Sequence, residues 1–142
     1  ELVKWAEENK KNICHWFMVD DLNHLRRGGR ISTTSAFLGS MMNIRPVLNI
    51  DAEGKLNFVE KARGRNKAID FMVSKMEELG VDLSDQTIFI SHGDCEEDAK
   101  DLVEKIKSKF NVKNIVINHV GPVIGSHTGA GALALFFIGK HR

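Results

Sequence analysis

The segment from Gly121 to Gly131 gathers side chains suited to binding a ligand. It reads Gly-Pro-Val-Ile-Gly-Ser-His-Thr-Gly-Ala-Gly, so Ser126, His127 and Thr128 lie among four glycines. Glycine lets the backbone approach a ligand closely, and hydroxyl and imidazole groups both donate and accept hydrogen bonds. We therefore expect a glycine-rich loop whose polar side chains face a ligand. The alternative is a tight connection in which His127 only satisfies a backbone carbonyl.

Arg30 is a second candidate because it directly follows Gly28 and Gly29. A single arginine fixed after two glycines can hold a carboxylate through two parallel hydrogen bonds. Arg26 and Arg27 are instead expected at a solvated helix end, where positive charge complements the helix dipole.

Several well-known catalytic and binding patterns do not occur in the sequence. The glycine-rich segment lacks the Gly-Lys-Ser/Thr of a nucleotide-binding loop, and neither Ser91 nor Ser126 stands in a Gly-x-Ser-x-Gly elbow. His92 and Cys95 have the spacing of a metal-ligand pair that His119 could join, but zinc sites need a second such pair, so no metal is expected. The sequence has no Tyr, and no ladder of aromatic residues interleaves the basic block, which argues against base stacking on single-stranded nucleic acid.

The spacing of apolar residues predicts both helices and strands. Helical spacing occurs over residues 2–12, 21–28, 33–42, 66–79 and 95–110. Strand formers dominate residues 13–19, 44–50, 55–61, 87–90, 115–117 and 132–138. The strand–helix–strand order across residues 87–117 is typical of a right-handed crossover between parallel strands. The predicted fold class is therefore α/β (α+β), with a mixed β-sheet and helices in two layers.

Residues with strong positional preferences are expected to set the helix boundaries. Asp20 is predicted to cap the short helix over residues 21–28, and Gly28 to end it in the left-handed conformation. Asp94 is predicted to cap the helix over residues 95–110. Ser32 or Thr33 has the same predicted role for the helix over residues 33–42.

Length and composition suit a globular domain. The 142 residues fit one domain, or one domain with a piece of another, and the first residue is Glu1, so we expect a piece of a longer protein. Hydrophobic residues at 42% and charged residues at 27% argue against disorder. No apolar run approaches the ~18 residues of a transmembrane helix, and no signal-peptide pattern opens the sequence. Cys14 and Cys95 lie outside any Cys-x-x-Cys motif, so we expect buried thiols in a reducing cytoplasm.

A net charge of +1 conceals strongly charged blocks. Residues 26–67 carry nine Lys or Arg and three Asp or Glu, whereas residues 68–104 carry two and eleven. Arginines of the basic block lie beside glycines, as expected where a surface meets an anion or an acidic partner.

Four blocks of the sequence resemble, in order, the C-terminal half of a bacterial DegV-family protein, the fatty-acid-binding subunit of fatty acid kinase. The blocks are residues 20–32, 42–48, 61–65 and 121–131. The resemblance extends over nearly the whole chain. The family usually has Lys, Val and Pro where this chain has Arg45, Ala62 and Ala130.

This resemblance implies a two-domain protein that encloses a long-chain fatty acid in a tunnel between its domains. The protein presents the carboxyl group to an ATP-dependent fatty acid kinase, which forms the acyl phosphate, and performs no chemistry itself. No catalytic residue, cofactor, metal, nucleic acid or membrane segment is expected, and the expected location is the cytoplasm. Residues 1–28 would be the trailing helix and strand of the N-terminal domain plus the bridging helix. Residues 29–142 would be the C-terminal lipid-binding domain.

The same resemblance assigns roles to individual residues. Arg30 and His127 should complete the polar network around the carboxyl group, with Ser126 and Thr128 beside them. Arg63 should face the kinase. A buried carboxylate needs such partners because its desolvation is costly unless it is paired and hydrogen-bonded.

The acyl chain needs an apolar lining, and several residues could supply it. The candidates are Phe37, Leu38, Met41, Met42 and the run 133–138. The alternative for each is a place in the ordinary core.

Two other functions fit the residues. One is an enzyme for a small anionic substrate, with His127 as acid–base and Arg30 as the anion clamp. The other is a regulatory module whose basic block contacts an acidic protein or nucleic acid. The residues alone do not decide between a fatty-acid-binding carrier and an enzyme. The resemblance favours the carrier.

Overall fold

Six strands form one mixed sheet in the computed structural model, which describes residues 1–31 and 43–142. The strands are β1 Ile13–Met18, β2 Ile44–Ile50, β3 Leu56–Arg63, β4 Thr87–His92, β5 Asn114–His119 and β6 Leu133–Ile138. Their order across the sheet is β3-β2-β1-β6-β4-β5. The β4–β5 pair is parallel, as the crossover predicts, and the other pairs are antiparallel.

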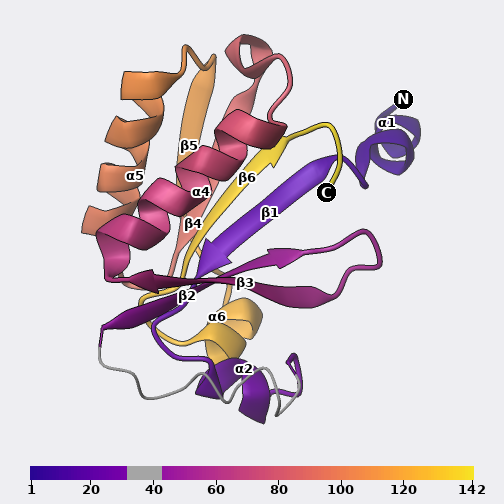
Figure 1. Cartoon of the computed structure of the whole chain (residues 1–142). Helices are drawn as coiled ribbons and strands as arrows, with labels where there is room; N and C mark the ends of the chain where they lie inside the picture. Colours follow the sequence, from indigo (N-terminus) through magenta and orange to yellow (C-terminus); the bar gives the residue numbers. More distant parts are fainter. Residues whose placement is uncertain (32–42) are drawn as a thin grey trace.

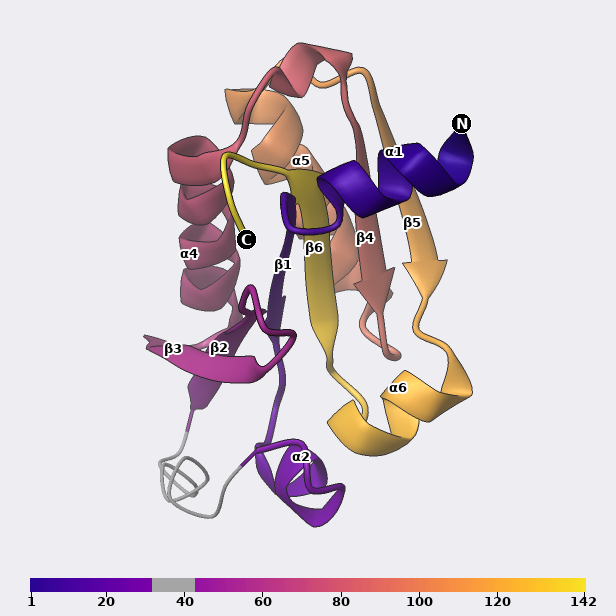
Figure 2. The same cartoon turned by 90° about the vertical axis from the view of Figure 1, so that its right-hand side faces the viewer.

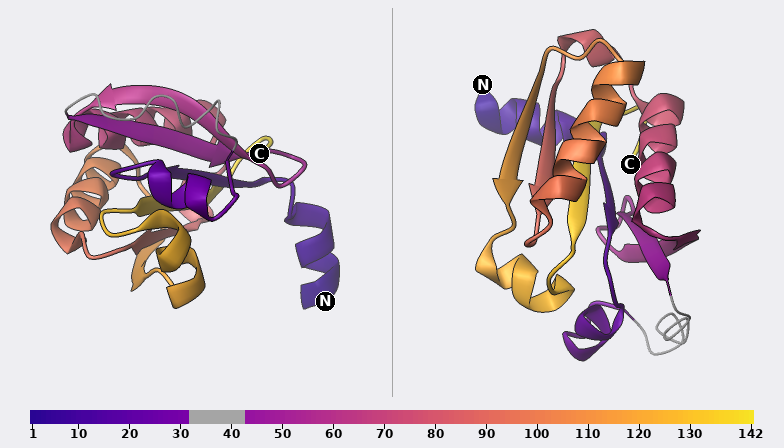
Figure 3. Two further views of the ribbon diagram at one scale, coloured as in Figure 1. Left: turned by 90° about the horizontal axis from the view of Figure 1, so that it is seen from below. Right: turned by 90° about the vertical axis from the view of Figure 1, so that its left-hand side faces the viewer.

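Two long helices cover one face of this sheet, and two short ones lie at its end (Figures 1 and 2). The long helices are α4 Arg65–Leu79 and α5 Glu96–Lys109, and the short ones are α2 Asn23–Arg27 and α6 Pro122–Thr128. Figure 3 shows α4 and α5 packed side by side on the sheet. The other elements in residues 1–31 and 43–142 are α1 Leu2–Asn9 and a 3-10 turn over Leu83–Asp85. One sheet layer and one helix layer confirm the predicted α/β class.

The main core lies between the sheet and the long helices. Every second residue of β6 faces it, so that Leu133, Leu135 and Phe137 are buried. The stripe predicted for α4 is buried against them, including Ile69, Met72 and Met76. Since both long helices lie on this side, the other face of the sheet keeps apolar side chains exposed, and Phe89 of β4 is 49% accessible to solvent.

Most of the segment from Gly121 to Gly131 is a helix, α6, and not the expected loop. Pro122 occupies the first turn, where its missing N–H is harmless, and α6 continues through Gly125 to Thr128. The helix ends at Gly129, whose φ of 75° suits glycine. The high glycine content therefore concealed a helix of 7 residues between Gly121 and Gly129.

Three predicted helix boundaries are wrong. Asp94 has a positive φ of 56°, and Cys95 takes the N-cap position of α5. Gly28 is right-handed, and it is Gly29 that has the positive φ, 69°. Asp20 does not cap α2, because its carboxylate forms ion pairs with two arginines instead. The helix predicted over residues 33–42 lies outside the described residues.

The strand over residues 13–18 belongs to the same sheet as the rest of the chain. β1 lies between β2 and β6 and pairs with both. The division of the chain into residues 1–28 and 29–142 stays a prediction. Within the described residues, α1 buries none of its side chains, and its assignment to a preceding domain stays a prediction.

Across residues 1–31 and 43–142, no helix has both the length and the apolar character that crossing a bilayer requires.

Both cysteines are reduced and have weakly acidic thiols. Burial raises the pKa of Cys14 to about 11 and also raises the pKa of Cys95. Because the thiolate is the nucleophile, we expect iodoacetamide at about pH 8 to modify native Cys14 roughly 100-fold more slowly than the unfolded chain. Mass spectrometry of quenched time points measures this rate. Equal rates in native and unfolded protein would contradict the burial of Cys14.

Candidate functional site

The candidate site lies where α2 and α6 pack against each other at one end of the sheet (Figure 2). Each helix ends in a glycine that leaves room for a histidine of the other helix. A Cβ on Gly28 would overlap the imidazole ring of His127, and a Cβ on Gly129 would lie 2.7 Å from Cδ2 of His24. The close approach of the two helices therefore depends on these glycines.

Arg30 and His127 come together at this junction and line the same cavity. Nη1 of Arg30 donates a hydrogen bond to the Gly28 carbonyl at 2.8 Å, which holds the guanidinium beside the end of α2. Arg30 is exposed to solvent, and His127 is half-buried. The two side chains are about 100 residues apart in sequence, so the sheet and its crossover bring them to one place.

The cavity extends from this polar end over the open face of the sheet and has a volume of about 540 Å³. That volume lies within the range of ligand pockets for small molecules, roughly 300–1,000 Å³. Among the described residues, its lining is apolar apart from Arg30, Thr128 and two histidines. It consists of Trp16, Phe17, Leu25, Ile50, Leu56, Val120, Val123, Ile124, Ala132, Leu133, Ala134 and Phe136.

The run 133–138 contributes only part of its length to this lining. Ala134 and Phe136 line the cavity, whereas Leu133, Leu135 and Phe137 are buried in the core on the helix side, and Leu133 borders the cavity only at the start of the strand. Successive side chains of a strand point to opposite faces, so a continuous apolar run cannot present every residue to one ligand. The predicted lining residues Phe37, Leu38, Met41 and Met42 lie outside the described residues.

The two candidate hydroxyl groups are both engaged by α6 itself. Oγ of Ser126 donates to the Val123 carbonyl at 2.8 Å, and Oγ1 of Thr128 donates to the Ile124 carbonyl at 3.0 Å. Thr128 is buried and lines the cavity, where its oxygen can still accept a hydrogen bond. Ser126 is exposed and does not line this cavity. The structure thus brings Arg30, His127 and Thr128 together without Ser126.

His15 lines the cavity farther from the α2–α6 junction and was missed in the sequence. It lies opposite Phe136 in the β1–β6 register, and the two rings meet edge-on with centroids 5.2 Å apart. Burial, together with the nearby Arg142 charge, lowers the pKa of His15, so its imidazole is neutral near pH 7. The alternation of side chains along a strand could have revealed it, because His15 and Phe17 are two residues apart on β1 and line the same cavity.

Arg63, the predicted partner-binding residue, is exposed at the last position of β3. It lies opposite Ile44 in the β2–β3 register and does not line the cavity. Arg65, two residues later, is only 21% exposed and forms ion pairs with Asp20 and Asp98.

The histidine pair at the ends of β4 and β5 brings His92 and His119 together, with ring centroids 4.4 Å apart. Nδ1 of His92 accepts a hydrogen bond from the backbone N–H of Cys95 at 3.3 Å. Within the described ranges, no three His, Cys, Asp or Glu side chains gather to hold a metal ion.

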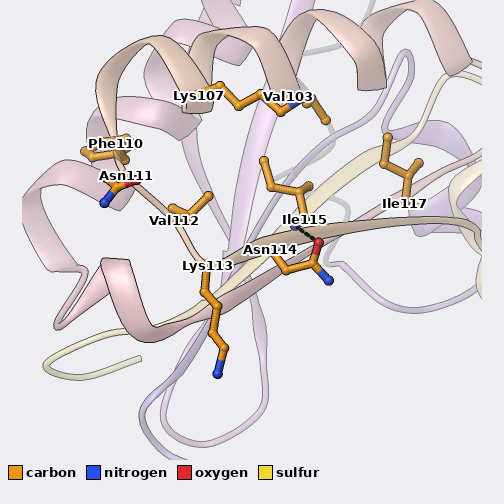
Figure 4. A pocket seen from close by; sticks show the side chains of 9 residues that line it. All are labelled: Val103, Lys107, Phe110, Asn111, Val112, Lys113, Asn114, Ile115 and Ile117. Carbon is orange, nitrogen blue, oxygen red and sulfur yellow. Dashed lines mark hydrogen bonds between the residues drawn. The ribbon is translucent and has the colours of Figure 1, made fainter.

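A second cavity of about 470 Å³ lies at the edge strand β5, beside the end of α5 (Figure 4). Lys107 and Lys113 are among its lining residues, and it contains none of the predicted site residues. Its lining is more polar and lies outside the α2–α6 junction, so the first cavity is the better candidate for an amphipathic ligand.

Comparison with known proteins identifies the family. The model of a family described as an uncharacterised protein of the DegV family matches residues 1–140. A DegV domain-containing protein of Clostridium perfringens is 50% identical over 142 residues, which are 100% of this chain and 49% of that protein. The chain therefore belongs to the DegV family, as its motifs indicated. It spans about half the length of the curated relatives it matches.

Solved structures with the same fold include proteins described by their ligands. The structure of a DegV family protein from Thermus thermophilus, described by its fatty acid binding, has a TM-score of 0.85 and 27% identity, covering 97% of this chain and 49% of that chain. The fatty acid kinase (Fak) B3 protein of Streptococcus pneumoniae, loaded with linoleic acid, has a TM-score of 0.86 and 19% identity, covering 98% and 49%. At that identity, the second likeness shows the fold alone.

Proposed function

We propose that this chain forms part of a fatty-acid-binding protein, with the fatty acid lying in the cavity on the open face of the sheet. The observation that carries the proposal is a single cavity with Arg30 and His127 at one end and an apolar lining elsewhere. Arg30 can pair with a carboxylate, and His127 can donate a hydrogen bond to it. Membership of the family that includes the T. thermophilus protein supports this ligand.

The acyl chain would run from the α2–α6 junction along β6 and β1. Leu133 and Ala134 begin β6 next to the junction, and Phe136 and His15 lie farther along. Each buried CH₂ contributes ~0.8 kcal/mol, so burial of the chain would dominate affinity while the polar end sets the orientation.

Presentation of the bound acid to an ATP-dependent kinase is a further part of the proposal. It rests on the resemblance of residues 61–65 to the family motif, and Arg63 is exposed outside the cavity, where a partner can reach it. In this role the chain holds the carboxyl group while the partner transfers the phosphoryl group. The chain itself would need no catalytic residue or cofactor, and the location would be the cytoplasm.

Extraction of the purified full-length protein with organic solvent tests the ligand class. Mass spectrometry of the extract should show long-chain fatty acids in near-stoichiometric amount, and the stripped protein should take up added palmitate. A protein that yields no fatty acid and takes up none would contradict the proposal.

Substitution Ala134→Phe should shorten the preferred acyl chain. The small Ala134 side chain lines the cavity and lies opposite Phe17, so a phenyl ring there fills space that the chain would occupy. Losing room for two or three CH₂ groups predicts roughly 10–100-fold weaker binding of long acids, with shorter acids much less affected. Competition binding with acids of graded length measures the shift. Ile117→Phe, on β5 at the second cavity, is the matched control and should leave the preference unchanged.

A further inference from the structure

Arg65, the first residue of α4, contacts both segments that lead to the polar residues of the site, Arg30 and His127. Its Nη1 forms an ion pair with the Asp20 carboxylate, and its Nη2 donates to the Gly131 carbonyl at 2.9 Å. Its Nε donates to Oδ2 of Asp98 at 2.6 Å. The three nitrogens of one guanidinium thus contact three separate parts of the chain.

Two of these contacts hold the connections that lead to the site. Asp20 stands between β1 and α2, the helix that precedes Arg30, and Gly131 stands between α6, which carries His127, and β6. Asp20 also pairs with Nε of Arg45 at 3.0 Å. Gly131 has a φ of 82°, and a Cβ there would lie 2.5 Å from Oδ2 of Asp20, so the two connections touch at this point.

The third contact anchors Arg65 to the rigid part of the molecule. Asp98 lies in the first turn of α5, and Arg65 itself opens α4, so both belong to helices packed on the sheet. The backbone of Gly93 adds support, since its carbonyl accepts from the Gly131 N–H at 2.6 Å and its N–H donates to Ala132 at 2.8 Å. The two connections are therefore fixed against the α4–α5 layer.

We propose that Arg65 is a positioning residue, which sets the distance and orientation between Arg30 and His127 by holding the connections that precede α2 and follow α6. This inference rests on the proposed function. Arg65 does not appear among the described residues that line the cavity, so it acts without touching the fatty acid. Lysine could not replace it, because a single ammonium lacks the planar fork that reaches three acceptors at once.

The position of Arg65 also relates the site to the proposed kinase contact. Arg63, Gly64 and Arg65 are consecutive, with Arg63 exposed and Arg65 directed to the two connections. The same short segment thus carries the outward residue and the residue that positions the carboxyl site.

The test uses the full-length protein loaded with palmitate that carries carbon-13 at the carboxyl carbon. Wild-type protein should give one carboxyl resonance distinct from that of free palmitate. In Arg65→Gln, that resonance should move or broaden, and acyl-phosphate formation with the kinase should fall about tenfold or more, because small displacements at a reacting group are costly. Affinity for palmitate should change less than about threefold, because the apolar lining that dominates affinity stays in place.

Two variants separate positioning from general stability. Lys105→Gln removes an ion pair with Asp70 between α4 and α5 and should leave the carboxyl resonance unchanged. Arg65→Lys should not restore the wild-type resonance. If Arg65→Gln does not fold, Asp20→Asn tests the role of Arg65 in its place. Asp20→Asn should shift the carboxyl resonance in the same direction by a smaller amount.

The outcomes distinguish this inference from the function on which it rests. No bound resonance in wild-type protein would overturn the fatty acid proposal itself. A bound wild-type resonance that stays the same in Arg65→Gln, or in Asp20→Asn when the first variant does not fold, would overturn the role of Arg65 alone. The role of Arg65 would also be overturned if Lys105→Gln shifted the resonance as much as Arg65→Gln.

Discussion

Alanine in place of Gly28 is expected to disable the carboxyl-binding end of the cavity. Gly28 has a φ of −76°, which alanine adopts without strain, so the only new feature is a methyl group. That methyl group would overlap the imidazole of His127, and either the ring turns away or α2 separates from α6. A hydrogen bond to a charged group contributes about 1.5–3 kcal/mol, so its loss predicts roughly 10–100-fold weaker carboxylate binding. Titration of the stripped full-length protein with palmitate measures this change.

Gly121→Ala is the matched control for this prediction. Gly121 precedes α6, its φ is −66°, and a Cβ there would meet no described heavy atom within 4 Å. Palmitate affinity should therefore stay within about twofold of the wild-type value, which is well under 1 kcal/mol. Unchanged palmitate affinity in Gly28→Ala would show that His127 does not take part in binding.

Replacing Arg30 and Arg63 separately should produce two different patterns of loss. Arg30→Ala removes the cation at the polar end of the cavity, so the bound carboxylate loses its charge-assisted partner. We expect palmitate affinity to fall by about 10-fold or more, and acyl-phosphate formation to fall with it. Arg63 is exposed outside the cavity, so Arg63→Ala should leave palmitate affinity intact and lower only the coupling to the kinase.

The two assays for this pair are equilibrium palmitate binding and acyl-phosphate formation at saturating palmitate. Arg27→Ala serves as the control, because Arg27 is an exposed arginine at the end of α2, three residues before Arg30, and does not line the cavity. If Arg63→Ala released the fatty acid while Arg30→Ala retained it, the two assignments would be reversed.

The elements with long periodic patterns were predictable from the sequence. The six strands lie where strand formers dominate, and the buried stripes of α4 and α5 match the predicted spacing. These predictions succeed because burial of one face dictates the apolar period, whether 2 or 3.6 residues. The position of β1 in the middle of the sheet was not predictable in this way, since local patterns do not tell which strands pair.

Helix boundaries and the site lining were harder to predict because they depend on tertiary contacts. Asp20 has the residue type of a cap, yet two arginines from distant segments compete for its carboxylate. α6 was concealed because glycines bound it at both ends, and one of them, Gly129, leaves room for His24 of α2. His15 and Ile50 line the cavity only because the strand order brings β1 and β2 beside β6. Arg30 and His127 were candidates because of the glycines around them, but only the family motif indicated that they serve one carboxyl group.

A crystal structure of the full-length protein with a long-chain fatty acid brominated at its tail tests the central proposal most directly. The anomalous signal locates the tail, and the density locates the carboxyl group. We predict that the carboxyl oxygens lie within hydrogen-bonding distance of Arg30 and His127, with the bromine beyond Ala134 toward Phe136 and His15. A fatty acid in the cavity between α5 and β5, or one whose carboxyl group lies at His15 with its tail at Arg30, would contradict the proposal.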